Sequence, residues 1–150
     1  MMSASPTPRA ISSPAPAPPR LRHGSSVLLV DYSADNREPY AWCLERSGYR
    51  VVEAGAGLEA LALLECNCAD LIITELALPD LDGFELCRRV RGRPDSPPVP
   101  VVALTALPLT RDRVRQVREA GIQVLLAKPC LPFTLLDCVR RVLDRGRKRL

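Results

Sequence analysis

The sequence predicts an α/β protein in which helices cover both faces of a five-stranded parallel sheet. Five short runs rich in leucine and β-branched residues recur along the chain, and amphipathic stretches of helical length separate them. Aromatic residues make up only 4% of the sequence, which favours a core of aliphatic side chains such as short parallel strands supply. With 150 residues and 47% hydrophobic content, the chain is long enough to bury the core of one domain.

The positions of the elements follow from these patterns. We expect strands at 27–30, 50–53, 71–74, 101–104 and 124–127, and helices near 36–47, 57–66, 83–92, 110–120 and 133–146. The last helix has the clearest signal, because one of its faces is entirely apolar: Leu135, Leu136, Val139, Val142 and Leu143. Gly48 and Gly121 lie where helix C-caps are expected.

One residue conflicts with the first helix. Pro39 has no backbone N–H, so a helix that began at Ala34 would lose the hydrogen bond to the carbonyl of Asp35. We therefore expect this helix to begin a few residues later or to be kinked.

Charge and proline content divide the chain into three parts. Residues 1–26 carry Arg9, Arg20 and Arg22 and no acidic residue, whereas residues 140–150 carry six basic residues against Asp144. We expect a disordered Pro/Ser/Arg-rich tail at 1–25, a folded domain at 26–145 and a basic C-terminal end at 146–150. Within the tail, the proline-rich stretch 14–19 has the composition of a polyproline spacer or ligand.

The six cysteines do not form a recognisable metal or disulfide pattern. No Cys-x-x-Cys pair occurs, and the single histidine, His23, lies in the tail. We expect free thiols in a reducing, cytoplasmic environment. No apolar run is long enough to span a membrane, and the N-terminus does not resemble a secretory signal.

Polar residues end four of the five predicted strands. They are Asp31, Glu75, Thr105 and Lys128. Because ligand sites of parallel sheets lie at the carboxyl ends of the strands, we expect these side chains to converge in one crevice suited to a cation or a phosphoryl group. The sequence after the first strand matches neither the dinucleotide nor the P-loop glycine pattern, and no Ser/His/Asp set can be assembled.

These residues, in this order, resemble the receiver domain of bacterial response regulators over about residues 26–145. Asp31 resembles the acidic residue after the first strand, the run 78–86 resembles the loop after the phosphoacceptor, Thr105 resembles the switch threonine, and Lys128-Pro129 resembles the Lys-Pro pair. The resemblance implies a flavodoxin-like doubly wound sheet with strand order 2-1-3-4-5.

Three positions depart from the family pattern. Glu75 stands at the position of the phosphoaccepting aspartate, Tyr32 replaces the second acid of the acidic pocket, and Leu125 replaces the aromatic switch residue. A glutamate places its carboxylate one methylene further out, and an error of about 1 Å can reduce a rate by about 10²-fold. Tyr32 removes a carboxylate ligand of Mg²⁺, which prefers octahedral oxygen coordination. We therefore expect no cofactor, negligible phosphorylation and no dedicated metal site; any residual Mg²⁺ affinity would depend on Asp31 and Glu75.

The function that we expect is a free-standing, non-enzymatic pseudo-receiver in two-component or phosphorelay signalling, which binds a partner protein such as a histidine kinase without being phosphorylated. Glu75 would either imitate the phosphorylated state through Lys128 and Thr105 or leave an inert scaffold. Two alternatives stay open: phosphorylation at a substitute acid (Asp35, Asp80 or Asp82), and nucleic-acid binding through the basic residues from Arg140 to Arg149. The identity of the partner and the oligomeric state do not follow from the sequence.

Overall fold

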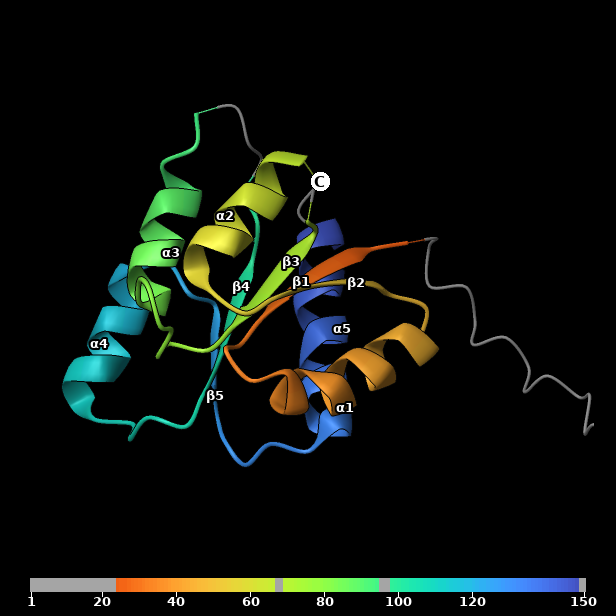
Figure 1. The fold of residues 1–150 in the computed structure, drawn as a ribbon. Helices are drawn as coiled ribbons and strands as arrows, with labels where there is room; N and C mark the ends of the chain where they lie inside the picture. Colours follow the sequence, from red (N-terminus) through yellow and green to blue (C-terminus); the bar gives the residue numbers. More distant parts are fainter. Residues whose placement is uncertain (1–23, 67–68, 95–97, 149–150) are drawn as a thin grey trace, which may run out of the picture.

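Strands and helices alternate strictly along the chain (Figure 1). The computed structural model describes residues 24–66, 69–94 and 98–148. The elements are β1 (Ser26–Val30), α1 (Ala34–Arg46), β2 (Arg50–Ala54), α2 (Gly57–Cys66), β3 (Leu71–Thr74), α3 (Gly83–Arg91), β4 (Val101–Thr105), α4 (Arg111–Glu119), β5 (Val124–Ala127) and α5 (Pro132–Lys148). All five predicted strands and all five predicted helices are present.

The strands form one parallel sheet in the order β2-β1-β3-β4-β5. The predicted flavodoxin-like order is thereby confirmed. The chain begins in the sheet at β1, adds β2 on one side and then β3, β4 and β5 on the other. This reversal makes the carboxyl ends of β1 and β3 neighbours, which is where a doubly wound sheet places its site.

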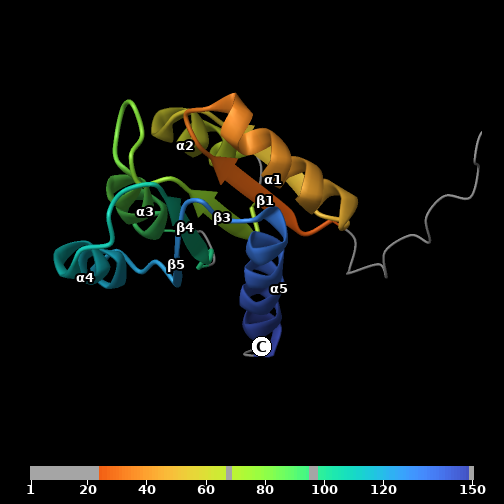
Figure 2. The ribbon, with the colours of Figure 1, turned by 90° about the horizontal axis from the view of Figure 1, so that it is seen from below.

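Two apolar layers cover the sheet, and side chains alternate between them along each strand. Val27 and Leu29 pack with α1 and α5, whereas Leu28 and Val30 pack with the layer that α2, α3 and α4 provide. Figure 2 shows α1 and α5 together on one face, with α2, α3 and α4 on the other. The predicted apolar face of the last helix is buried at Leu135, Leu136, Val139 and Val142, and Leu143 packs against the same cluster.

The start of α1 differs from the expectation. The helix begins at Ala34, with Ser33 as N-cap and Pro39 inside it, so the prediction of a later start at residue 36 was wrong. The side chain of Ser33 accepts a hydrogen bond from the backbone N–H of Asn36, which stabilises the early turn. Asp35 and Pro39 are both exposed, so water can satisfy the carbonyl that Pro39 leaves without a donor. The helix forms in spite of Pro39 because the hydrogen bonds at its two caps and the burial of Ala41, Cys43 and Leu44 offset the cost of the proline.

The predicted glycine caps end two helices. Gly48 and Gly121 have positive φ angles of 96° and 76°, which a residue without a Cβ adopts at low cost. After α1, the N–H of Gly48 donates to the carbonyl of Glu45, and the N–H of Tyr49 donates to that of Leu44. This double hydrogen bond is the Schellman arrangement, and it turns the chain directly into β2.

Most of the predicted N-terminal tail, as well as Cys68 and Arg149, lies outside the described residues. The last helix extends beyond the predicted end at residue 146 and reaches Lys148. Within the described ranges, no helix is both long enough and apolar enough to cross a bilayer.

Candidate functional site

Four polar residues that end strands lie together at the carboxyl edge of the sheet. Asp31 follows β1, Glu75 follows β3, Thr105 ends β4 and Lys128 follows β5. Asp31, Glu75 and Thr105 are buried, with exposed fractions of 5%, 3% and 0%. The structure thus places the four predicted residues in one cluster beneath the loops.

Lys128 joins the two carboxylates of this cluster. Its Nζ lies 2.5 Å from Asp31 Oδ2 and 2.9 Å from Glu75 Oε2. Hydrogen bonds between ionised partners are shorter and stronger than neutral ones. The lysine therefore neutralises part of the charge that two neighbouring buried carboxylates would otherwise leave uncompensated.

Donors surround the carboxylate of Glu75. Oε1 accepts from the backbone N–H of Leu76 at 2.7 Å, from the N–H of Ala77 at 3.2 Å and from Thr105 Oγ1. Oε2 accepts from the N–H of Ala106 at 3.2 Å in addition to the lysine ammonium. Three backbone amides, a hydroxyl and an ammonium thus surround a single anionic group.

This environment sets the charge state of the central pair. Burial acts to raise the pKa of Glu75, but the hydrogen bonds from Thr105 and Lys128 outweigh it and hold the pKa below its ordinary value. Burial acts to lower the pKa of Lys128, and its hydrogen bonds to Asp31 and Glu75 reverse the effect and raise the pKa. Both groups are therefore charged at neutral pH.

Asp31 is fixed by the first turn of α1. Its Oδ1 accepts from the backbone N–H of Ser33 at 2.9 Å and from Asn36 Nδ2 at 3.5 Å. Arg37 donates from Nη1 to the backbone carbonyl of Asp31 and from Nε to Glu53, 3.1 Å away. The sequence analysis did not identify Arg37, because an arginine six residues after an aspartate has no distinctive spacing.

The other two predicted positions, Tyr32 and Leu125, add no polar group to the cluster. The side chain of Tyr32 is 62% exposed, so its bulk lies mainly in solvent. Leu125 is half-buried and packs against the core layer of α2, α3 and α4. An aliphatic side chain at this position has no hydroxyl or ring with which to respond to a charge change beside Thr105.

The loop after β3 approaches Glu75 closely at Gly83. A Cβ at Gly83 would lie 2.7 Å from the carbonyl oxygen of Glu75 and 2.9 Å from Cα of Leu76. The N–H of Gly83 donates to the carbonyl of Leu76 at 2.8 Å. Any larger residue at position 83 would push this loop away from the cluster, so the glycine keeps the amides of Leu76 and Ala77 directed at the carboxylate.

Mg²⁺, which the family resemblance implies, does not fit the residues present. Asp31 and Glu75 are the acidic residues of the cluster, and both already accept from Lys128. No group of three or more His, Cys, Asp or Glu side chains placed to hold a metal occurs in the described part of the chain. Mg²⁺ needs several oxygen ligands at about 2.0–2.1 Å, and here ammonium and amide donors face the oxygens that would supply them.

The three acids proposed as substitute phosphoacceptors occupy different surroundings. Asp80 accepts from the backbone N–H groups of Gly57 and Leu58 at 2.8 and 2.7 Å, and Asp82 caps α3 through the N–H of Glu85 at 2.7 Å. Asp35 is exposed on the first turn of α1. The structure therefore assigns helix-capping contacts to Asp80 and Asp82 and shows neither of them bonded to Lys128.

Sequence reasoning identified the side chains of the cluster and missed its backbone donors. Leu76, Ala77 and Ala106 contribute through their N–H groups, which every residue except proline carries. Only the fold determines which of these groups point at Glu75.

Comparisons with known proteins give matches in both sequence and fold. A profile of the response regulator receiver domain matches residues 27–140. The chain is 37% identical over 115 residues to an uncharacterised 14.6 kDa protein in the sodA1 3′ region of Leptolyngbya boryana, covering 77% of this chain and 87% of that protein. It is 31% identical to the polar-differentiation response regulator DivK of Brucella ovis, covering 79% and 95%.

Solved structures show the same fold. The chemotaxis response regulator CheY4 of Vibrio cholerae superposes with a TM-score of 0.73 at 32% identity, covering 79% of this chain and 98% of that one. The chain spans about half the length of several other curated relatives, for example 46% of the probable transcriptional regulator ycf27 of Guillardia theta.

Proposed function

This chain belongs to the response regulator receiver family of two-component signalling, and on that premise we propose that it is a pseudo-receiver, which binds a partner protein in the cytoplasm without being phosphorylated. One observation carries the proposal: the carboxylate of Glu75 already holds Thr105 and Lys128. A phosphoryl group bound to an aspartate would offer oxygens to the same hydroxyl and ammonium. The partner would be another two-component protein, such as a histidine kinase.

Phosphoryl transfer depends on position and charge neutralisation. Both carboxylate oxygens of Glu75 are occupied: attack through Oε2 would compete with the Ala106 N–H and Lys128, and attack through Oε1 would compete with Thr105 and the N–H groups of Leu76 and Ala77. Among the residues that the structure describes, no group of three potential metal ligands replaces the carboxylate that Tyr32 removes. Two features therefore oppose phosphorylation. The carboxylate of Glu75 lies one methylene further from the backbone than that of an aspartate, and Tyr32 supplies no carboxylate ligand for Mg²⁺.

Glu75 would fix one signalling state rather than act as a switch. Thr105 is fully buried and donates a hydrogen bond to Glu75. Leu125 has neither a hydroxyl nor a ring that could change orientation when Thr105 moves. The surface over α4, β5 and α5 would then present one permanent conformation to the partner.

The test uses beryllofluoride with Mg²⁺, a phosphoryl analogue that requires a correctly placed carboxylate and a divalent cation. We expect the amide resonances of Thr105, Ala106 and Lys128 to stay unchanged in the native protein. The matched control is the double variant Tyr32→Asp with Glu75→Asp. It carries the acids of the family pattern at both positions, so these resonances should shift. Saturable shifts in the native protein would contradict the proposal.

A further inference from the structure

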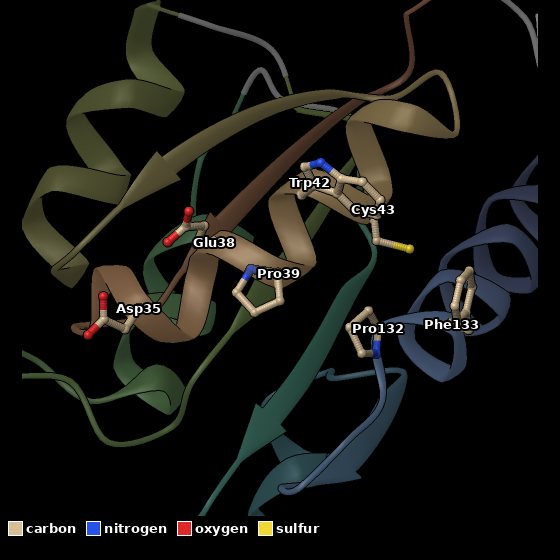
Figure 3. A pocket seen from close by; sticks show the side chains of 7 residues that line it. All are labelled: Asp35, Glu38, Pro39, Trp42, Cys43, Pro132 and Phe133. Carbon is tan, nitrogen blue, oxygen red and sulfur yellow. The ribbon is translucent and has the colours of Figure 1, made fainter. Parts of the chain in front are cut away.

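An apolar groove lies between α1 and the beginning of α5 (Figure 3). Its volume is about 650 Å³, and it is lined by residues of α1 between Asp35 and Cys43 and by Pro132 and Phe133 of α5. Among these, Trp42 is 59% exposed and Phe133 is 72% exposed. Two large aromatic side chains thus face solvent in one place, and such a concentration of apolar surface marks an interaction site.

The two walls of the groove are held together. The hydroxyl of Tyr40, on α1, donates to the carbonyl of Cys130 at 2.6 Å, two residues before α5 begins. On the inner side of α1, Ala41 and Leu44 are buried in the core layer to which α5 also contributes. The groove is therefore formed before a partner arrives, which reduces the ordering cost of binding.

The exposed face of α1 changes in character along the helix. Asp35 and Glu38 are exposed in its first turns, and Figure 3 shows Trp42 further along the same helix. Arg46, the last residue of the helix, is exposed, and its guanidinium lies 4.8 Å from the centre of the Trp42 ring. Within the described ranges, Asp35, Glu38 and Arg46 form no ion pair. The helix thus presents an acidic end, an apolar middle and a basic end to solvent.

These positions are symmetric about the middle of the helix. Asp35 and Arg46 lie equally far, along the chain, on either side of a point just after Tyr40. Pro39 and Trp42 are related in the same way. The eleven positions from Asp35 to Arg46 make about three helical turns, so both side chains leave the helix on the same side. An identical helix that runs in the opposite direction would therefore place basic against acidic and proline against tryptophan.

We propose that α1 of a second copy of this chain occupies the groove, antiparallel to the first α1 and related to it by a twofold axis between the midpoints of the two helices. Arg46 of each copy would lie beside Asp35 and Glu38 of the other. Pro39 of each copy would pack against Trp42 of the other. A twofold interface forms every contact twice, so one self-complementary helix face is sufficient for the pairing.

The stacking of Arg46 on Trp42 supports this pairing. A guanidinium stacked on an aromatic ring keeps the N–H groups at its edge free for a carboxylate. The stacking also restricts the long arginine side chain in advance, so that less rotamer entropy is lost on association. Glu45 is exposed as well, but it lies about 100° around the helix from Arg46 and does not line the groove.

The size of the contact sets the expected affinity. One pair of helices bordered by Phe133 is small beside the roughly 800 Å² per partner that is typical of stable interfaces. We therefore expect a reversible dimer with a dissociation constant in the micromolar range. No contact of this pairing involves Glu75 or Lys128, so the proposal is independent of whether the chain is phosphorylated.

Sedimentation equilibrium of the full chain at several concentrations tests the pairing. The native chain should pass reversibly from monomer to dimer, and the emission of its single tryptophan, Trp42, should shift to shorter wavelength as the dimer forms. Asp35→Arg with Glu38→Arg should weaken the dimer about tenfold or more, because like charges then meet twice. Arg46→Glu should weaken it similarly for the same reason.

A mixture of these two variants gives the sharpest result. In a mixed pair, the new arginines of one copy face the new glutamate of the other, and the native charges face each other at the second contact. Equal amounts of the two variants should therefore restore association, although neither variant associates alone. Trp42→Ser, which changes an exposed side chain, should weaken the native dimer without a change of charge.

The matched controls make the same charge changes at exposed positions on α4: Asp112→Arg with Glu119→Arg, and Arg118→Glu. Both controls should dimerise as the native chain does. The proposal is overturned if the native chain stays monomeric up to about 1 mM, or if the Trp42→Ser variant or either α1 charge variant associates as tightly as the native chain. It is also overturned if the mixed variants, each with a native circular dichroism spectrum, fail to associate, or if the α4 controls weaken the dimer equally.

Discussion

Glu75 and Lys128 form an ion pair in which Nζ lies 2.9 Å from Oε2, although 53 positions separate them in the sequence. The exposed fractions of the two side chains are 3% and 15%, so solvent screens the pair little. This contact joins the end of β3 to the end of β5 and crosses in front of β4.

Replacing Glu75 by Gln should destabilise the domain, because Lys128 loses one of its two partners and Thr105 loses an ionised acceptor. Lys128 keeps Asp31, so we expect a loss of about 1–3 kcal/mol in the free energy of unfolding, less than for a fully orphaned buried charge. Urea denaturation measures it. Glu53→Gln, which breaks the more exposed pair with Arg37, is the matched control and should cost less than about 1 kcal/mol. Equal losses in the two variants would show that the buried pair has no special role.

The same carboxylate predicts a pH dependence of stability. The pKa of Glu75 is lowered in the folded protein from its ordinary value of 4.5. A lowered folded pKa contributes stability that is present above the unfolded value and is lost as the pH falls through the folded value. We therefore expect the unfolding free energy to decline below about pH 4.5 in the native protein, and to decline less steeply in the Glu75→Gln variant. Parallel acid profiles for the two proteins would contradict the assignment.

Pro39 predicts a variant that is more stable than the native protein. Pro39→Ala restores the hydrogen bond to the carbonyl of Asp35 and removes a residue that costs about 3 kcal/mol inside a helix, offset by about 0.4–1 kcal/mol from the freer unfolded chain. We expect a net gain of about 2–2.6 kcal/mol, read as a higher urea midpoint. Ser33→Ala, which removes the N-cap of the same helix, should instead lower it by about 1 kcal/mol.

The cysteines should differ in reactivity according to burial. Cys66 is exposed, whereas Cys43 and Cys87 are buried, and burial raises the pKa of Cys87 to about 11. Because the thiolate is the nucleophile, iodoacetamide at pH 8 should modify Cys66 well before Cys43 and Cys87. Peptide mass mapping over time gives the order, and modification in guanidinium provides the reference in which burial is lost. Rapid modification of Cys87 in the folded protein would contradict the packing of α3.

The sequence patterns sufficed for the element order and most of the element boundaries, because hydrophobic periodicity reports directly on burial. They failed at the start of α1, where the local penalty of Pro39 was overcome by the Ser33 cap and by packing of Ala41 and Leu44. Asp31, Glu75, Thr105 and Lys128 could be named because strand ends of a parallel sheet converge. The amides around Glu75, the Arg37 contact and the groove beside Trp42 could not, since they depend on how loops and helix faces meet in space.

The central claim is that the carboxylate of Glu75 binds Thr105 and Lys128 in place of a phosphoryl group, and that the chain is not phosphorylated. The most direct measurement is the intact mass of the protein after incubation with acetyl phosphate and Mg²⁺, compared between the native chain, Tyr32→Asp, Glu75→Asp and the double variant. We predict no added phosphoryl group on the native chain, little on either single variant and clear addition on the double variant, because the two substitutions restore one site together. A phosphoryl adduct on the native chain, at Glu75 or at Asp35, Asp80 or Asp82, would contradict the claim.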